Sequence, residues 1–368
     1  MMPNLLGGVI SVLAGLCAIL LIFFVLWDVF EVIILPRRVS RRVRLTTLIY
    51  LVTWRPWSSI AQQMRSDGRR ENFLSFYGPL SLIVLLAVWM VGLIVGYALL
   101  QWALGSAVSG IGEASGFPTD LYMSGTTFIT LGLGDVIPRT GLARLLTVIE
   151  AANGFGLLAV VIGYLPVLYQ SFSRREANIT LLDARAGSPP SAVEMLRRYG
   201  QDKDVNALNQ FLREWELWAA ELLESHLSYP SLAYFRSQHD NQSWLAALTV
   251  IMDVCTLVLV GIDDIPTHQA RLTFAIARHA AVDLSQILNT LPPKYETKLV
   301  RKFNIGKIRK ILREAGMPMR EGEMADEQLN KMRGMYESYV DTLADRLMMP
   351  LPTWIPAEGS QDDWLSSA

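Results

Sequence analysis

Three long apolar runs constrain the fold of this chain more than any other feature of its sequence. They cover Leu5 to Leu35, Pro79 to Leu104 and Leu142 to Phe172. A helix rises about 1.5 Å per residue, so each run is long enough to cross about 30 Å of hydrocarbon. Charged residues make up only 18% of the chain, against about 25% in soluble domains. All lysines lie beyond position 200, which indicates a membrane half followed by a more polar half.

The charges between the apolar runs predict how the chain is oriented. Residues 36–73 contain nine arginines against Asp67 and Glu71, so the positive-inside rule places this stretch in the cytoplasm. Within it, Thr46 to Trp57 is apolar but too short to span, which favours a helix at the headgroup level. The loop 105–117 has no basic residue. We therefore expect the N-terminus outside and the C-terminus in the cytoplasm, in the inner membrane of a prokaryotic cell.

A short segment between the second and third runs cannot cross a bilayer. Pro118 suits the first turn of a helix, and Asp120 complements the positive end of the helix dipole. A helix of about twelve residues reaches roughly 18 Å, which is about half way across. Irregular backbone at membrane depth is tolerated only where it lines water or is buried in protein. Residues 118–138 are therefore predicted to form a re-entrant loop around an aqueous path.

The return of this loop reads Thr130-Leu-Gly-Leu-Gly-Asp135. It resembles the selectivity filter of potassium channels, usually written TVGYGD, and the resemblance covers roughly residues 74–175. A filter presents a row of carbonyl oxygens that replace the hydration shell of the ion. Gly132 and Gly134 can adopt the positive φ values that such a row requires.

The resemblance implies a set of roles for these residues. Thr130, Leu131, Gly132, Leu133 and Gly134 would line the ion path, with potassium ions held at Thr130 to Leu133. Asp135 would attract cations at the outer mouth, and Phe128 would support the filter from the end of the pore helix. One filter per chain implies a homotetramer, because the ring of carbonyls needs four loops. Leucine at position 133 cannot form the hydrogen bonds of the usual tyrosine, so a weakly selective cation channel is the nearest alternative.

The third run carries three further candidates. Glu150 and Gly154 stand four residues apart, as in the inner helices of many bacterial channels, which would place Glu150 behind the filter and Gly154 at a bend. An intramembrane carboxylate is costly and is functional or paired by default, and a hydrogen bond to the pore helix is the favoured interpretation. Pro166 is predicted to kink the helix near an inner gate. Simple small-residue packing at Gly154, and an ordinary helix-end proline at Pro166, are the alternatives.

Beyond residue 176 the pattern is helical and more polar. Trp244 to Gly261 is an apolar stretch interrupted by Asp253; we favour a buried helix over a fourth span, because aspartate costs about 2.5–3.5 kcal/mol at a helix centre. Lys294 to Arg313 holds eight basic residues against Glu296. This segment is predicted to be a basic amphipathic helix that meets anionic lipid or an acidic ligand, or else a solvated face.

Together these features predict an all-α membrane protein with three transmembrane helices, a re-entrant pore helix and filter loop, and a helical cytoplasmic domain. The expected divisions are an N-terminal helix (1–36), a basic linker (37–73), a pore domain (74–175), a helical domain (176–350) and an irregular tail (351–368). We expect a potassium channel in contact with membrane lipids, gated at its inner helix by the helical domain. No enzymatic activity, organic cofactor or nucleic-acid partner is expected.

The alternatives from other classes are a structural scaffold and a membrane-anchored sensor or enzyme whose tail carries the activity. A metal site in the tail would have to use residues scattered along the chain: His226, His239, Asp240, Asp253 and His279.

Overall fold

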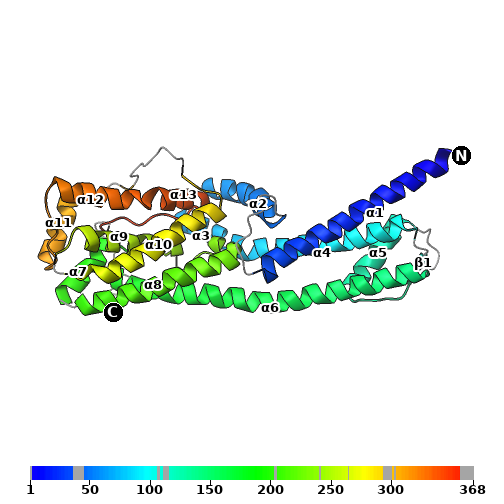
Figure 1. Cartoon of the computed structure of the whole chain (residues 1–368), viewed down its shortest axis with the longest axis horizontal. Helices are drawn as coiled ribbons and strands as arrows, with labels where there is room; N and C mark the ends of the chain where they lie inside the picture. Colours follow the sequence, from blue (N-terminus) through cyan, green and yellow to red (C-terminus); the bar gives the residue numbers. More distant parts are fainter. Residues whose placement is uncertain are drawn as a thin grey trace. The chain divides into compact units, whose positions relative to one another are not determined.

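The computed structural model of the chain describes residues 2–35, 45–105, 108–110, 116–202, 205–239, 242–263, 265–292, 301 and 304–356 (Figure 1). The chain divides into two compact units. The first unit consists of Met1–Trp57 and Pro79–Tyr169, and the second unit consists of Ser58–Gly78 and Gln170–Ala368.

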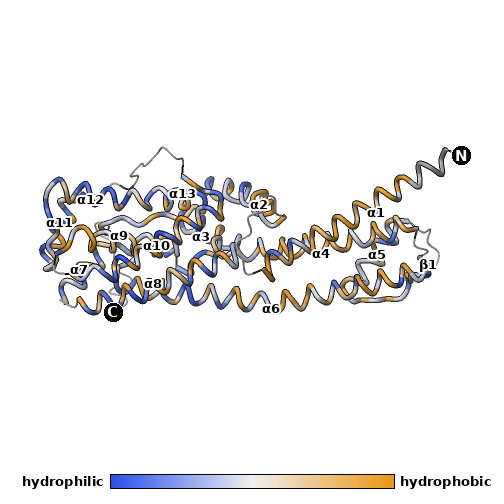
Figure 2. The backbone as a smooth tube through the Cα atoms, in the orientation of Figure 1, coloured by the Kyte–Doolittle hydropathy of each residue, from blue (hydrophilic) through white to orange (hydrophobic). Residues whose placement is uncertain are grey.

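The first unit is built from apolar helices, drawn mainly in orange in Figure 2. Its elements are α1 (Met2–Val29), the π-helical turn η1 (Phe30–Ile34), α2 (Leu45–Gln62), α4 (Tyr77–Ala103), α5 (Phe117–Phe128) and α6 (Gly141–Ala186). A short antiparallel ribbon joins β1 (Val108–Gly110) to β2 (Val136–Pro138). In the part of the chain that the structure describes, three helical stretches are long and apolar enough to cross a membrane: Gly7–Ile34, Asp67–Ala103 and Gly141–Ala186. The predicted all-α membrane fold with three spanning helices is therefore confirmed.

The extra helix α1 packs closely against α4. Gly92 and Gly96 of α4 stand four residues apart, and a Cβ atom added at Gly96 would lie 2.6 Å from Cγ1 of Ile22. At Gly92 the same atom would lie 3.0 Å from Cγ2 of Val25. Small residues at this spacing let two helices in a membrane approach closely. The contact extends into a buried cluster of α1, α4 and α5 side chains: Val25, Val29, Leu85, Trp89, Leu93 and Phe128.

A buried carboxylate joins α1 to α4 and α2. Asp28 accepts a hydrogen bond of 2.9 Å from the indole nitrogen of Trp89 and one of 2.7 Å from the hydroxyl of Thr46. Glu31 accepts a 2.7 Å hydrogen bond from Trp27. Each carboxylate therefore has polar partners at the end of the first span, where a lone charge would be costly.

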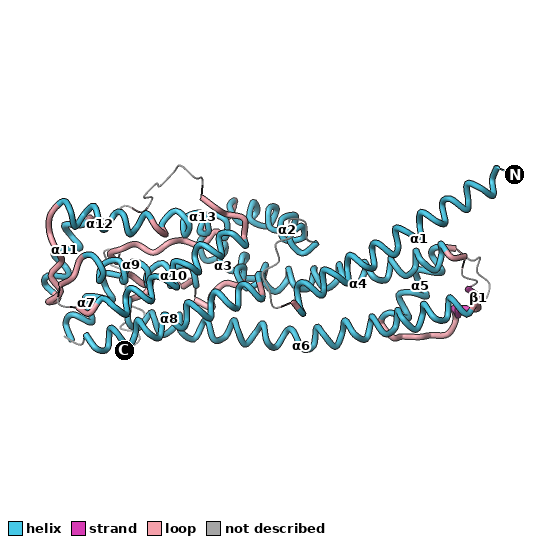
Figure 3. The backbone as a smooth tube through the Cα atoms, in the orientation of Figure 1, coloured by secondary structure: helices cyan, strands magenta, loops and turns pink. Residues whose placement is uncertain are grey.

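The second unit is a helical bundle (Figure 3). It contains α3 (Asp67–Ser75), the end of α6, α7 (Ala192–Asp202), α8 (Val205–Ser228), the 3₁₀ turn η2 (Pro230–Tyr234), α9 (Trp244–Val260), α10 (Thr267–Ile287), α11 (Ile305–Glu314), α12 (Glu323–Gly334) and α13 (Glu337–Leu347). Residues 58–78 belong to this unit although they precede α4 in the sequence. The basic linker expected from the sequence therefore contributes to the helical bundle.

Helix α9 is the buried centre of this bundle. Its 17 residues are almost all buried and pack against α7, α10 and α12. Asp253 in the middle of the helix accepts hydrogen bonds of 2.7 and 2.8 Å from the guanidinium group of Arg301. The Tyr336 hydroxyl donates a third hydrogen bond to the same carboxylate. The interpretation of this apolar stretch as a buried helix of the C-terminal half is confirmed. Asp253, whose charge argued against a membrane span, is paired with Arg301.

Candidate functional site: a half-length helix and its return loop

Helix α5 has the length and start that the sequence predicts. It begins after Gly116, which has an extended backbone, and it carries Pro118 in its first turn. Proline is favoured there because the first helical N–H groups have no partner within the helix. Its 12 residues, Phe117–Phe128, reach roughly 18 Å. The chain therefore has to return on the same side, as expected of a re-entrant segment.

The return segment has a left-handed residue at every second position. The φ angles are 57° at Thr130, 55° at Gly132 and 78° at Gly134. The two glycines adopt this conformation without a steric penalty, as the sequence predicts. Thr130 does so at a cost, because a β-branched residue rarely has a positive φ. Strain of this kind persists only where the surroundings hold it, and it is concentrated at functional sites.

Hydrogen bonds from the last turn of α5 hold the start of the return. The carbonyl oxygen of Thr126 accepts bonds from the backbone nitrogens of Leu131, at 2.8 Å, and Gly132, at 3.2 Å. The side chains of Leu131 and Leu133 are 56% and 59% exposed in the single chain. The backbone of the return segment is thus held to α5 by main-chain hydrogen bonds, while its two leucine side chains are exposed.

Tyr122 connects the middle of α5 to the far end of the return. Its hydroxyl donates a hydrogen bond of 2.8 Å to Oδ2 of Asp135, and Oδ1 of Asp135 accepts one of 3.0 Å from the nitrogen of Val136. This bond was not predicted from the sequence. Because α5 and the return segment run in opposite directions, a residue in the middle of α5 can lie beside the end of the return. Tyr122, eight residues before Thr130, was therefore the sequence signal for this bond.

Ser124 joins α5 to the two spanning helices beside it. Its Oγ lies 2.8 Å from the carbonyl oxygen of Ile94 in α4 and is hydrogen-bonded to Oε1 of Glu150 in α6. Glu150 is completely buried, and its Oε2 has no hydrogen-bond partner among the residues that the structure describes. The sequence predicted a structural hydrogen bond from Glu150 to the pore helix, and the structure has this bond. Ser124 itself was not foreseen.

Gly154 lies against the end of α5. A Cβ atom added at this position would lie 2.0 Å from the carbonyl oxygen of Phe128, so only glycine permits this approach of α6. Phe128 is buried and packs against the α1–α4 cluster on its other side. The structure thus has the close packing that was the alternative to a bend at Gly154. A gating role for this glycine stays a prediction.

Further polar contacts fix α4 against α6. Gln101 donates a 3.2 Å hydrogen bond to the carbonyl oxygen of Ala143, and Asn153 is hydrogen-bonded to the hydroxyl of Tyr97. Pro166 lies inside α6, which continues to Ala186. Its role at a gate stays a prediction.

The basic segment Lys294 to Arg313 lies partly outside the described residues. Where it is described, its arginines have acidic partners: Arg301 binds Asp253, Arg309 binds Asp326 and Arg313 binds Glu321. Ile308 and Leu312 of α11 are buried. The amphipathic helix is therefore present from residue 305, and much of its described charge is neutralised within the chain. Its predicted contact with anionic lipid or an acidic ligand stays a prediction.

Two members of the scattered metal set have other partners. His226 faces Arg175 and Asp253 binds Arg301, while Asp240 lies outside the described residues. Within the described part of the chain, no three His, Cys, Asp or Glu side chains gather as a ligand set.

Comparison with known proteins agrees with this geometry. Residues 83–170 match the family model described as "Ion channel", so this part of the chain is an ion channel domain. It covers α4 from its second turn, α5, the return segment and α6 as far as the end of the first unit.

A relative in Bacillus subtilis (strain 168), the "uncharacterized membrane protein YdjJ", is 23% identical over 200 residues. That match covers 54% of this chain and 58% of the relative, so the chain spans little more than half the length of that protein. No solved structure matches the chain.

Proposed function

We propose that this multi-pass membrane protein is one subunit of a homotetrameric potassium channel. Four return segments would surround one axis, and potassium ions would pass down their gradient through Thr130 to Gly134. The protein would carry out no covalent chemistry and would need no organic cofactor. The protein would contribute to permeation by providing a path of fixed width in which the ion loses part of its water.

One observation carries the proposal: positive φ at Thr130, Gly132 and Gly134, directly after a half-length helix. Alternation of positive and negative φ allows successive carbonyl oxygens to face one side of the backbone. A row of such oxygens can replace the water around a dehydrated cation. The negative end of α5 points in the direction of the same path and would favour a cation there. Asp135, held by Tyr122, would raise the local cation concentration at the mouth.

A weakly selective cation channel is favoured by one feature, the residue at position 133. The leucine side chain has no polar atom and is 59% exposed in the single chain. It therefore cannot hold the middle of the filter at a fixed width through hydrogen bonds. The bond from Tyr122 to Asp135 supports selectivity from the outer end instead.

The proposed orientation follows the arginine-rich stretch before α4, with the N-terminus outside and the second unit in the cytoplasm, in the inner membrane. The second unit would gate the pore through α6, at Gly154 and Pro166. The exposed apolar side chains of α1 and α6 would meet lipid or neighbouring subunits, and they include Val12, Leu20, Phe155 and Ile162.

Potassium flux in proteoliposomes tests the proposal. Gly132→Ala should abolish flux while the tetramer still assembles, because alanine resists a φ of 55°. Gly141→Ala is the matched control: both glycines have open space around the added Cβ, but only Gly132 has a positive φ. Equal potassium flux in wild type and Gly132→Ala would refute the proposal that residues 130–134 form the ion path. Equal uptake of sodium, rubidium and potassium by the wild type would favour the weakly selective channel.

A further inference from the structure

A seven-residue segment of the second unit contacts elements from four parts of the sequence. This segment, Pro230–Arg236, comprises η2, Phe235 and Arg236, and we refer to it as the junction segment. It follows α8 and precedes α9. Its partners include residues 71–78, which lead into α4, and residues 172–175 of α6. Both helices continue into the ion channel domain.

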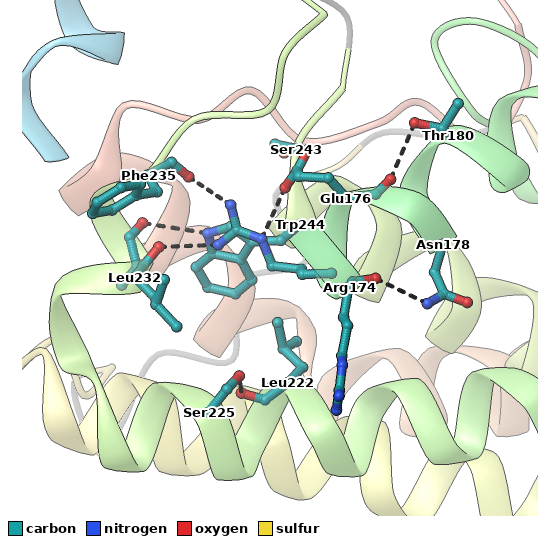
Figure 4. Close-up of polar contacts among 12 residues, drawn as sticks. Arg174, Glu176, Asn178, Thr180, Leu222, Ser225, Leu232, Phe235, Ser243 and Trp244 are labelled. Carbon is teal, nitrogen blue, oxygen red and sulfur yellow. Dashed lines mark hydrogen bonds and ion pairs between the residues drawn. The ribbon is translucent and has the colours of Figure 1, made fainter. Parts of the chain in front are cut away.

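Arg175 of α6 is fixed on the junction segment by both terminal nitrogens of its guanidinium group. Nη1 donates a 2.9 Å hydrogen bond to the carbonyl oxygen of Leu232, and Nη2 donates one of 2.8 Å to that of Phe235. Figure 4 shows these two carbonyl groups converging on one guanidinium group, while the labelled Arg174 side chain extends away from them. Arg175 is almost fully buried. Two carbonyls in a fixed arrangement require the planar fork of arginine, which lysine lacks.

Arg175 has further partners in α6 and α8. Its Nε donates a 2.9 Å hydrogen bond to Glu176, and Nη1 lies 3.3 Å from Nε2 of His226. The carbonyl oxygen of Arg175 accepts a 3.3 Å bond from the indole of Trp218 in α8. Removal of the side chain would therefore leave several buried polar groups without partners.

Aromatic contacts join the same segment to α6 and to the start of α4. The ring of Phe235 lies 5.7 Å from that of Phe172, and the ring of Tyr234 lies 5.2 Å from that of Tyr77. A Cβ atom added at Gly78 would lie only 2.8 Å from Cδ2 of Phe235. The first turn of α4 therefore fits closely around the phenylalanine ring.

On its other side, the junction segment contacts the C-terminal helices. Arg236 pairs with Glu71 at 3.4 Å and donates a 3.1 Å hydrogen bond to the carbonyl oxygen of Met348, just beyond α13. Trp244, the first residue of α9, donates a 3.3 Å bond to the carbonyl oxygen of Ala233. A rearrangement of α9 or α13 would therefore displace the junction segment. A displaced segment would move the contacts of α4 and α6.

We propose that the junction segment transmits rearrangements of the second unit to the inner and outer pore helices together, with Arg175 and Phe235 as its positioning residues. This inference rests on the proposed channel function and names the element through which the second unit acts on it. The junction segment is not part of the proposed filter, Thr130 to Gly134. A change in the position of the junction segment should therefore alter the open probability of the channel, and leave the conductance and ion selectivity of the open channel unchanged.

Single-channel recording of the full-length protein in planar bilayers, with potassium and sodium as the only permeant ions, tests the inference. Arg175→Gln and Phe235→Leu should each change the open probability roughly fivefold or more, in the range of ordinary coupling between sites. Unitary conductance and the potassium-to-sodium permeability ratio should stay at wild-type values. Arg174→Gln, at the exposed neighbouring position, is the matched control and should leave open probability unchanged.

A double-mutant cycle provides the second measurement and does not depend on Arg175. Gly78→Ala inserts a methyl group against the Phe235 ring, so its effect on open probability should shrink when Phe235 is leucine. Unaltered gating in folded Phe235→Leu and Gly78→Ala proteins would overturn the inference, as would changes that simply add. A wild-type protein that conducts no cation would instead refute the proposed channel itself.

Discussion

The hydroxyl of Tyr122 lies 2.8 Å from a carboxylate oxygen of Asp135, across the full height of the return segment. The donor lies in the middle of α5 and the acceptor at the end of the return segment. The bond therefore links two residues 13 positions apart, whereas the backbone hydrogen bonds from the return segment to Thr126 lie at its start. It fixes the outer end of the segment against the helix that precedes it.

Tyr122→Phe should loosen the end of the return segment near Asp135, which is the outer mouth in the proposed channel, and it leaves residues 130–135 unchanged. A typical intramolecular hydrogen bond contributes about 0.5–1.5 kcal/mol, so we expect potassium flux to decline faster during sustained conduction and selectivity over sodium to fall. The measurement is macroscopic current in reconstituted bilayers. Asp135→Asn should act in the same direction, and the double variant should be no worse than the stronger single variant. Fully additive effects would show that the bond is not the cause.

Ser124→Ala should destabilise the packing of α5 between α4 and α6. It removes the contacts to the Ile94 carbonyl and to Glu150, and a buried polar group left unpaired costs about 1–3 kcal/mol. We expect a lower midpoint of thermal unfolding in detergent. Ser124→Thr keeps the hydroxyl and serves as the control. If the alanine and threonine variants have the same midpoint of thermal unfolding, the hydroxyl contributes nothing to this packing.

Gly154→Ala should disrupt the first unit far more than Gly156→Ala. The added Cβ at Gly154 would lie 2.0 Å from the Phe128 carbonyl oxygen, whereas nothing lies within 4 Å of the added atom at Gly156. Helix α6 would have to move away from the end of α5, so we expect loss of flux and of thermal stability at position 154 only. Flux and unfolding midpoints of the two variants, measured side by side, provide the check. Similar losses at both positions would contradict the close approach.

The packing of α1 on α4 can be tested by exchanging bulk across the interface. Gly96→Ala places a methyl group 2.6 Å from Cγ1 of Ile22, and overpacking of this kind costs about 1–3 kcal/mol. Ile22→Ala in the same chain should restore much of the lost stability, measured as the unfolding midpoint in detergent. Without such rescue, α1 would not pack against α4 through this face.

Acid should destabilise the second unit through His226. Burial, together with the charge of Arg175, lowers the pKa of His226 from 6.5 to about 3. Between these values the unfolded chain binds a proton that the folded chain does not. Stability from this residue is therefore complete above pH 6.5 and falls as the pH drops, by about 1.4 kcal/mol per unit.

Denaturant unfolding of the full chain in detergent, followed by tryptophan fluorescence, measures this slope. His226→Gln should flatten it, while a change at the exposed His279 should not. A wild-type stability that stays constant from pH 6.5 to pH 5 would contradict the assignment.

Local signals in the sequence predicted much of the first unit. Run length identified three spanning helices, and Pro118 together with the length of its apolar stretch identified α5. The left-handed conformations of Gly132 and Gly134 followed from the absence of a Cβ atom. Each of these features depends on residues close together in the chain, so a single sequence contains the relevant information.

Contacts between distant residues were harder to predict. Arg301 looked like part of a charged surface, yet it pairs with Asp253, 48 residues away. Asp253, in an apolar run, indicated that a basic side chain must lie nearby, but the sequence offered several arginines that could have paired with it. Residues 58–78 likewise gave no sign that they belong with the C-terminal half, because their partner Arg236 lies 165 residues from Glu71. Such pairings depend on the fold as a whole.

The contact of Asp28 with Trp89 has a consequence for biosynthesis. A ribosome delivers the first span well before the second, so a nascent chain holds its carboxylate near the bilayer without the indole that later covers it. Arrival of α4 supplies that donor together with the glycine groove for α1. Until α4 is made, Thr46 is the donor that the chain can offer Asp28, so a chain arrested between the two spans would hold this carboxylate without its indole bond.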